Sequence, residues 1–405
     1  MAVLGFAAGI AALLAACGLF AVTAAAFAVQ RFATRTPQLP RHRPAVTVLR
    51  PLCGDEPMLE AALASICDQD YPEFQIVFGV RDANDPALLA VQRLRGRFPA
   101  CDIVMVTDAA AHGANRKISN LINMMPAARH EVLVFSDSDL HVPSDYLERI
   151  VAALEMPGIG LVTTVCLGLP TTAGLAARLG ATVISHSFLP GALLSRVLGR
   201  EDCLGTTMAL RRDTLARIGG LTSLVGHLAD DNVLGKRVHR LGLGIGLADT
   251  VPMTAVPERS LRTLWQRELR WARTIRALEP VLFALSTLQF PLFWAAAAFA
   301  LSGGAAWSGY LFLAVWTVRA IAARWTDRAL LQKRRSTGAV PVWLLPLREC
   351  MSVCQVIASY LGGRVMWRGH VMHADDGQIF PSKEFFSNVE AHLQVNSDPV
   401  SSNSA

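Results

Sequence analysis

Two aspartates separated by one serine directly follow a short apolar run. The run 132–135 is typical of a buried strand, and Asp137 and Asp139 come immediately after it. Side chains at positions i and i+2 leaving a strand point to the same side, so both carboxylates could ligate one cation. Such oxygen ligands suit Mg²⁺ or Mn²⁺, which would neutralise the charge that develops when a nucleotide diphosphate leaves. The alternative is a turn in which an aspartate caps the next helix.

A second pair of acids, Asp230 and Asp231, precedes the helix-like segment 233–241. A carboxylate in a cleft at this point could take the proton from an attacking hydroxyl group. The alternative is that the two acids only stabilise the N-terminus of that helix.

The third motif is Arg-Glu-Leu-Arg-Trp at positions 267–271. On a helix, Arg267 and Arg270 lie on one face, where two guanidinium groups could hold a diphosphate. A basic patch on lipid headgroups is the alternative, but that explanation gives Trp271 no role.

Alternating strands and helices between residues 44 and about 274 must position these motifs. Repeated units of this kind predict a parallel sheet with helices on both faces. Ligands of such sheets bind beyond the carboxyl ends of the strands, where Asp137 and Asp139 are expected. The expected strands are 45–49, 74–80, 103–106 and 132–135, and the expected helices are 58–67, 86–98 and 118–125.

The N-terminal segment 2–29 contains no charged residue and exceeds the roughly 20 residues that cross a bilayer. It lacks the basic start of a secretory signal, although its alanine-rich end leaves cleavage open as an alternative. Four arginines follow and should keep the next domain in the cytoplasm by the positive-inside rule. They are Arg31, Arg35, Arg41 and Arg43.

The C-terminal part contains further apolar segments. Segments 281–303 and 305–323 are predicted spans, and a basic loop follows them. Segment 339–363 is interrupted by Arg348 and Glu349, which are costly at membrane depth unless the two are paired with each other or face a polar cavity. It is either a fourth span or a re-entrant or interfacial element. The expected division is therefore 1–30 (a membrane helix), 44–275 (a cytoplasmic domain), 280–370 (membrane segments) and 371–405 (a polar, partly disordered tail).

The composition excludes two broad classes. Hydrophobic residues make up 52% and charged residues 17% of the 405 residues, which excludes a disordered chain and argues against a wholly soluble one. The net charge is +6, but lysine and arginine are scattered, so we expect no nucleic-acid binding. The eight cysteines form no metal-finger spacing and indicate a reducing compartment.

The order of the motifs resembles the membrane glycosyltransferases of families 2 and 21, and more closely the ceramide glucosyltransferase branch. An acid after the second strand, Asp85, is followed by DSD, DD and RxxRW, before apolar C-terminal segments. The turn PLCGDEP (51–57), the stretch NRKISNL (115–121) and LADD (228–231) resemble bacterial hopanoid-associated members of that branch. The similarity covers about residues 45–275 and returns weakly near 347–349 and 366–369. It implies an α/β fold with a Rossmann-like domain of the GT-A type.

The resemblance also implies roles for single residues. By position, Asp85 matches the acid that contacts uridine, and Lys117 and Gly54 match residues of the nucleotide-sugar site. Asp137 and Asp139 match the pair that binds the diphosphate and its metal. Asp231 matches the catalytic base, and Asp230 is its neighbour. Arg267, Arg270 and Trp271 match the motif that closes over the diphosphate and the acceptor. His186 matches a histidine near the acceptor. For His186, the alternative is a polar residue on an apolar interfacial helix.

The implied reaction is single-displacement transfer of a sugar from a UDP-sugar to a membrane lipid, in a bacterial inner membrane with the catalytic domain in the cytoplasm. The apolar segment 172–198 and the segment 339–363 could frame a lipid entrance. The resemblance favours N-acetylglucosamine and a hopanoid polyol, with glucose and ceramide as the alternative. Animal ceramide glucosyltransferases can lack the third residue of DxD, which is Asp139 here. A non-catalytic membrane scaffold and a metal-ion transporter are rivals from other classes, and the oligomeric state stays open.

Overall fold

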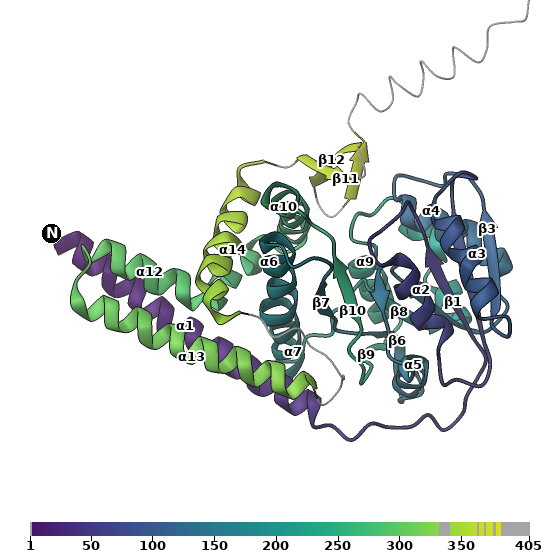
Figure 1. The fold of residues 1–405 in the computed structure, drawn as a ribbon, viewed down its shortest axis with the longest axis horizontal. Helices are drawn as coiled ribbons and strands as arrows, with labels where there is room; N and C mark the ends of the chain where they lie inside the picture. The colour runs from purple at the N-terminus through teal and green to yellow at the C-terminus, as the bar shows by residue number, and fades with distance from the viewer. Residues whose placement is uncertain (1, 332–340, 363, 368–369, 376–377, 382–405) are drawn as a thin grey trace, which may run out of the picture.

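The computed structural model describes residues 2–331, 341–362, 364–367, 370–375 and 378–381. Within them, a seven-stranded sheet with helices on both sides is joined to a bundle of long apolar helices (Figure 1).

The large sheet has the strand order β3-β2-β1-β4-β8-β6-β9. Its pairings are parallel except those of β8 with β4 and β6. The predicted all-parallel sheet is therefore wrong at β8. The reason is that the chain returns to the sheet beside the carboxyl end of β4, where Thr207 pairs with Ser136. Strand β8 then runs antiparallel to β4. The strands are β1 (Val46–Pro51), β2 (Phe74–Val80), β3 (Asp102–Thr107), β4 (Val132–Ser136), β6 (Ile159–Thr163), β8 (Thr207–Arg211) and β9 (Gly244–Leu247).

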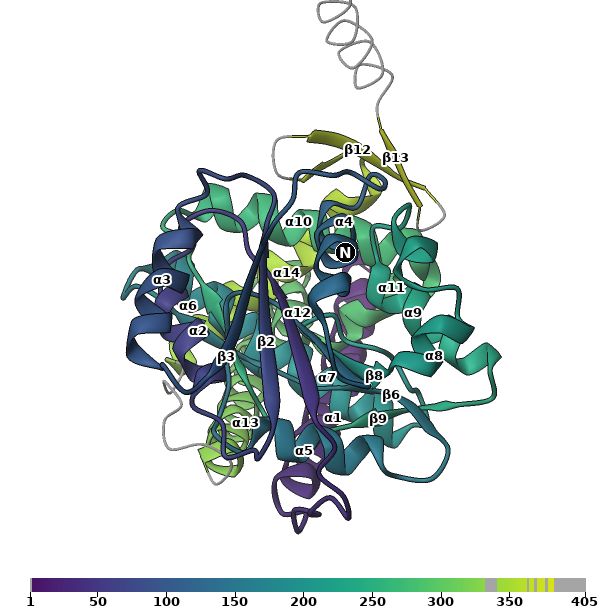
Figure 2. The same ribbon diagram turned by 90° about the vertical axis from the view of Figure 1, so that its right-hand side faces the viewer.

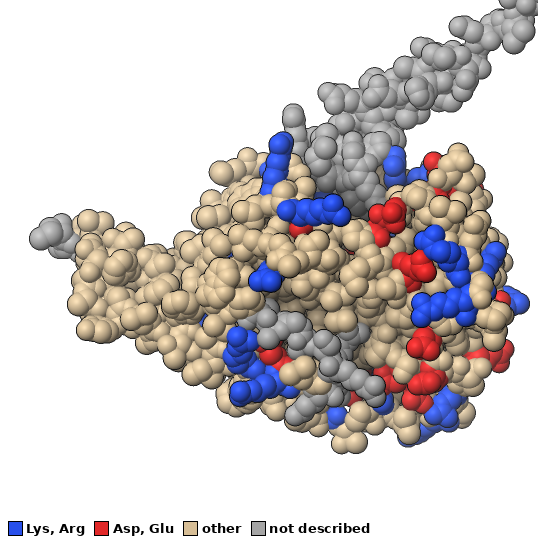
Figure 3. Space-filling view, viewed as in Figure 1, with Lys and Arg blue, Asp and Glu red and all other residues tan. Residues whose placement is uncertain are grey.

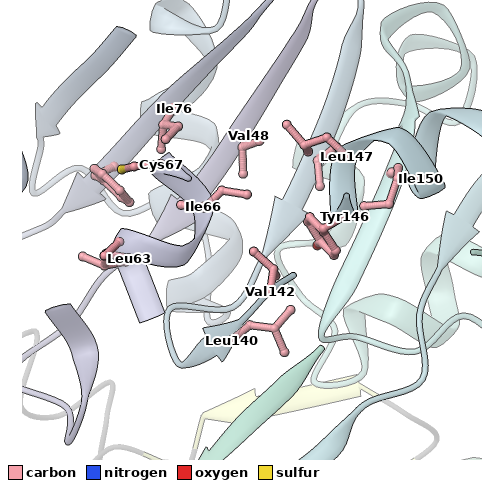
Figure 4. Packing of buried hydrophobic residues seen from close by; sticks show 14 of the residues in the cluster. Val48, Leu63, Ile66, Cys67, Ile76, Leu140, Val142, Tyr146, Leu147 and Ile150 are labelled. Carbon is pink, nitrogen blue, oxygen red and sulfur yellow. The ribbon is translucent and has the colours of Figure 1, made fainter. Parts of the chain in front are cut away.

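A hydrophobic core lies between each face of the sheet and the helices that cover it, as expected from the prediction of helices on both faces. Val132 and Val134 of β4 belong to one core, whereas Leu133 and Phe135 belong to the other, as expected for alternating side chains. Figure 4 shows part of the first core around Val48, Ile66 and Tyr146. The first core includes side chains of helices α2 (Leu59–Cys67), α3 (Ala87–Arg97) and α5 (Tyr146–Leu154). The second includes side chains of α4 (Arg116–Met124), α8 (Arg212–Arg217) and α9 (Asp230–Arg240). Figure 2 shows α2 and α3 on one side of the strands and α4, α8 and α9 on the other.

Two smaller sheets flank this core. Strands β5 (Leu140–His141), β10 (Met253–Val256) and β7 (Leu167–Pro170) form one sheet beside the end of β4. Strands β11 (Arg364–Trp367), β12 (His370–Asp375) and β13 (Gln378–Pro381) form an antiparallel sheet. The last two lie at the start of the expected polar tail, and residues 382–405 of that tail fall outside the described residues.

The long apolar helices are α1 (Ala2–Ala33), α12 (Pro291–Leu301) and α13 (Ala306–Leu331), which pack against one another. Three helical segments in the described residues are long and apolar enough to cross a membrane, namely Val3–Ala33, Ala306–Leu331 and Val342–Tyr360, or four if the bent pair that includes α12 counts as one span. The face shown in Figure 3 carries no charged side chain on the protruding part of the bundle. The predicted span 281–303 is not one straight helix, because the segment Pro280–Gln289, which begins with α11 (Pro280–Leu285), meets α12 at a 75° bend.

The interrupted segment 339–363 contains α14 (Leu345–Tyr360). Its span candidate, Val342–Tyr360, meets the length criterion, and half of its most apolar window is buried inside the protein. Figure 1 shows α14 lying across the bundle, beside α6 (Leu175–Val183) and α10 (Leu261–Leu278), both of which it contacts. This placement fits the interfacial alternative.

Candidate active site

The two acids of the DSD motif lie in the turn between β4 and β5. Asp137 is the first residue after β4, and Asp139 immediately precedes β5. The Thr254 hydroxyl on β10 donates a hydrogen bond to Asp139 Oδ2 at 2.6 Å, and the Ser138 hydroxyl donates to Glu56 Oε2 at 2.5 Å. The small sheet and the turn after β1 therefore fix the position of this motif.

Lys117 joins the DSD motif to the second acid pair. Its Nζ lies 2.7 Å from Asp137 Oδ1 and 3.9 Å from Asp230 Oδ2, and it donates a hydrogen bond to Gly205 O at 3.3 Å. Burial alone would lower the pKa of Lys117, but the charges of Asp137 and Asp230 outweigh it and raise the pKa. Lys117 is therefore a permanent cation between two acids that lie 93 positions apart in the sequence.

Asn115 holds Lys117 in place at the start of α4. As the N-cap residue, its Oδ1 accepts a hydrogen bond from Ile118 N at 3.1 Å. Its Nδ2 donates to His227 O at 2.9 Å and to Asp230 Oδ1 at 3.4 Å. One side chain thus begins the helix and orients the acid pair.

Asp230 and Asp231 occupy the first turn of α9, whose N-cap is Ala229. Neither acid is the N-cap residue, but both lie at the N-terminal end of the helix, where the alternative explanation also places them. Burial raises the pKa of Asp230. Burial and the neighbouring charge of Asp230 raise the pKa of Asp231 to about 6. A Cβ on Gly205 would come within 2.8 Å of Asp231 Oδ2, so glycine is needed there to leave room for this carboxylate.

The RELRW motif lies on α10, which begins after the N-cap Ser260. Arg267 Nη1 donates to both oxygens of Glu258 at 2.6 Å, and its guanidinium lies 4.5 Å from the ring centroid of Trp271. The positive charge of Arg267 also lowers the pKa of Asp139, although burial and Asp137 raise it more, to about 6. The motif is therefore close to the DSD turn. Arg270 lies one helical turn from Arg267, and Trp271 is 36% exposed.

The glutamate inside that motif forms a buried network with α14. Arg348 Nη1 lies 3.1 and 2.9 Å from the two oxygens of Glu268, and Gln355 Nε2 donates to Glu268 Oε2 at 2.7 Å. Arg348 also donates to Ser352 and Gln355. Arg348 and Glu349 are therefore not paired with each other, because Glu349 accepts a hydrogen bond from Arg319 at 2.8 Å. Each is instead buried against a partner of opposite charge on another helix.

Asp85 and Gly54 lie together beyond β2 and β1. Gly54 N donates to both oxygens of Asp85, at 2.9 and 3.0 Å, and Ala87 N donates to Asp85 Oδ1 at 2.9 Å. Gly54 has a φ of +78°, a conformation that favours glycine. The structure therefore brings together two residues that the sequence assigns to the nucleotide.

His186 lies apart from these contacts, on a π-helical turn spanning Ile184–Phe188. Its buried Nε2 lies 3.1 Å from Asp327 Oδ1 on α13, and its carbonyl oxygen accepts a hydrogen bond from Arg319 at 2.9 Å. The described contacts of His186 are thus to the helix bundle.

Four residues of the site were not predicted from the sequence: Glu56, Asn115, Glu258 and Arg348. Glu56 and Asn115 lie inside the stretches PLCGDEP and NRKISNL, so a closer inspection of those stretches could have identified them. No local spacing reveals Arg348 or Glu258 as partners of the RELRW motif.

The donors of the DSD motif fit a divalent cation. Asp137 raises the pKa of Asp139, so a cation between them would relieve their repulsion. Among the described residues, no cluster of three or more His, Cys, Asp or Glu side chains could hold a metal.

Solved structures identify the class of fold. A mannosyltransferase from Pyrobaculum calidifontis, solved in complex with GDP-Man and Mn²⁺, is 22% identical and has a TM-score of 0.50. The match covers 87% of this chain and 99% of that one. The fold is thus of the GT-A type found in sugar-transferring enzymes.

The sequence comparisons then give the family. Residues 10–380 match the model of glycosyl transferase family 21, and the chain belongs to this family of sugar-transferring enzymes. Ceramide glucosyltransferase 3 of Caenorhabditis elegans is 22% identical over 84% of this chain and 75% of its own length. An N-acetylglucosaminyltransferase of Rhizobium meliloti is 25% identical over 82% and 76%. A ceramide glucosyltransferase of Komagataella phaffii is 34% identical, but over only 31% and 26%.

Proposed function

We propose that this enzyme transfers a sugar from a UDP-sugar to the hydroxyl group of a membrane lipid, with inversion of configuration. The observation that carries the proposal is the contact of Lys117 with Asp137 and Asp230, next to Asp231. Lys117 thus links two pairs of acids. Asp137 and Asp139 are suited to bind a metal ion and a diphosphate, and Asp230 and Asp231 are suited to supply a general base. The helices that qualify as membrane spans belong to the same chain.

The donor lies over the DSD turn in this proposal. Asp137 and Asp139 would hold Mg²⁺ or Mn²⁺, which supplies charge neutralisation for the departing diphosphate. Arg267, stacked on Trp271, would hold a diphosphate oxygen, and Arg270 is on the same helix. Asp85 and Gly54, held together beyond β1 and β2, would bind the uridine.

Asp231 is the proposed base. Its pKa of about 6 leaves it ionised at neutral pH but closer to the working range than an exposed aspartate. It takes the proton of the lipid hydroxyl, whose oxygen attacks the anomeric carbon as the bond to UDP breaks. With one base and no enzyme nucleophile, the configuration inverts.

The favoured substrates are a UDP-N-acetylglucosamine donor and a hopanoid polyol such as bacteriohopanetetrol. The likeness to a relative named N-acetylglucosaminyltransferase supports this sugar. Glucose transfer to ceramide is the second candidate, since several relatives are named ceramide glucosyltransferases. The lipid would enter between α14 and a second helical segment, which contains α6, the π-helical turn Ile184–Phe188 and α7 (Leu189–Val197). His186 would lie on the acceptor side of this entrance. We place the enzyme in a bacterial inner membrane with the sheet in the cytoplasm, because arginines follow α1.

The test is lipid mass spectrometry on a hopanoid-producing host with and without this gene, together with purified protein given each donor and acceptor. Loss of an N-acetylhexosamine-bearing hopanoid, restored in vitro by UDP-N-acetylglucosamine, would support the favoured substrates. Loss of a hexosyl-ceramide with hopanoids unchanged would support the second candidate. No transfer from any UDP-sugar to any lipid would contradict both and favour a scaffold.

A further inference from the structure

Three arginines converge on a cavity where α1 ends and the chain leaves the helix bundle. The cavity has a volume of about 220 Å³. Its lining residues are Ala28, Arg31, Phe32, Arg35, Leu193, Arg196, Val197 and Leu247, and we call this the arginine pocket. Helices α1 and α7, which form most of it, pack against each other (Figure 1).

The polar side of the pocket carries like charges and an unused donor. Arg196 Nη2 donates to the backbone oxygen of Ile245, but Nη1 is buried and has no hydrogen-bond partner among the described residues. Burial lowers the pKa of Arg196, and the like charge of Arg35 acts in the same direction. A buried donor without a partner is unfavourable, so an anion that reaches Arg196 would relieve both effects.

The acids near Arg196 are engaged elsewhere. Glu201, whose charge reaches Arg196, accepts a hydrogen bond from Ile245 N at 2.9 Å. Asp202 forms a bidentate pair with Arg200 at 3.0 Å. Among the described residues, no carboxylate therefore hydrogen-bonds Arg196 Nη1, although the charge of Glu201 raises the pKa of Arg196.

The apolar side of the pocket faces the membrane helix. Phe32 and Leu193 are buried, whereas Arg31, on the last turn of the span candidate Val3–Ala33, and Arg35, two residues beyond its end, are exposed. The end of such a span lies at the depth of the phospholipid headgroups. The volume is below the roughly 300–1,000 Å³ of sites that hold whole drug-sized ligands, and it suits a headgroup whose chains lie outside.

We propose that the arginine pocket binds the phosphate of an anionic phospholipid, with the acyl chains of that lipid lying against α1. Basic pockets beside membrane helices bind such headgroups, and a guanidinium group matches a phosphate in a bidentate manner. The pocket shares α7 with the proposed lipid entrance, but none of its lining residues has a role in the proposed sugar transfer, so phospholipid binding can be tested without that reaction.

Native mass spectrometry of the purified full-length chain in mild detergent tests the site. The probes are palmitoyl-oleoyl phosphatidylglycerol, phosphatidylcholine with the same chains, and inorganic phosphate. We expect phosphatidylglycerol to be retained and phosphatidylcholine to be lost. Arg31→Gln with Arg35→Gln should weaken retention of phosphatidylglycerol more than tenfold, because each removed charge near a membrane surface is worth about fivefold.

Matched variants keep the test decisive. Arg43→Gln removes a nearby arginine that pairs with Glu148 and does not line the pocket, so it should leave retention unchanged. Arg196→Lys keeps the charge but loses the bidentate geometry and should weaken retention by less than the double variant. Equal retention by the wild type and the double variant would overturn the proposal, as would equal retention of the two lipids. Displacement of phosphatidylglycerol by millimolar phosphate would assign the site to a free anion and overturn the lipid assignment.

Discussion

Asp231 is the residue on which the proposed chemistry depends most directly. Asp231→Asn keeps the shape of the side chain but removes the base, so we expect the rate of sugar transfer to fall by about 10²- to 10⁴-fold. UDP binding should stay within about threefold, because Asp137, Lys117 and Arg267 are unchanged. Stopped-time transfer assays and calorimetric titration with UDP measure the two effects. Turnover above a tenth of the wild-type rate would exclude Asp231 as the base.

The same carboxylate predicts a pH dependence. Its pKa is raised to about 6, so the active, ionised form is lost as the pH falls below 6. We expect kcat/KM to fall about tenfold per pH unit below this value and to be level above about pH 7. Asp230→Asn removes the neighbouring negative charge that helps to raise the pKa of Asp231, so the acid limb should move to lower pH. An unchanged or raised apparent pKa in that variant would contradict the assignment.

Between elements, the buried network of Glu268 and Arg348 connects the RELRW helix to α14. Arg348→Met leaves Glu268 buried without its cationic partner, which typically costs about 3–5 kcal/mol. We expect a lower thermal midpoint and a higher KM for the UDP-sugar, because α10 also carries Arg267. Adding Glu268→Gln removes the unpaired charge and should recover part of both.

The control for the network is Arg93→Gln, which breaks an exposed ion pair with Glu60. Exposed ion pairs contribute about 0–1 kcal/mol to stability, so this variant should leave both the thermal midpoint and the KM for the UDP-sugar unchanged. Additive effects of the Glu268 and Arg348 substitutions in the thermal and kinetic data would show that the two residues are not coupled.

The sequence predicts those strands and helices that are specified by neighbouring residues, and misses those that depend on long-range packing. Strand β2 was predicted at its observed bounds, since alternation and flanking turn residues are read within a few positions. The reversed strand β8 was missed because pairing order is set by where helices return the chain. The DSD and DD motifs were found as separate local patterns. That Lys117 joins them depends on packing between α4, α9 and the end of β4, which no spacing reveals.

At the scale of the whole molecule, charge separates the two parts. Figure 3 shows lysine, arginine and acidic side chains gathered over the body that contains the sheet, while the protruding part of the bundle is uncharged on that face. Helix α1 contacts α12, α13 and α7, so the bundle combines the two ends of the sequence and also contacts the segment after β7. A lipid acceptor and a soluble nucleotide donor can therefore both reach one chain, from a membrane and from water respectively.

This arrangement predicts on which side of the membrane the sheet lies. Cys53, beside the proposed uridine-binding Gly54, is exposed, whereas the other exposed cysteines are Cys17 on α1 and Cys354 on α14. A membrane-impermeant maleimide should label Cys53 in inside-out vesicles but not in intact spheroplasts, because we propose that the arginines after α1 keep this side in the cytoplasm. Cys53→Ser is the matched control that isolates this signal. Equal labelling of Cys53 in intact spheroplasts would place the site outside the cell, away from cytosolic nucleotide sugars, and would contradict the proposed use of a UDP-sugar.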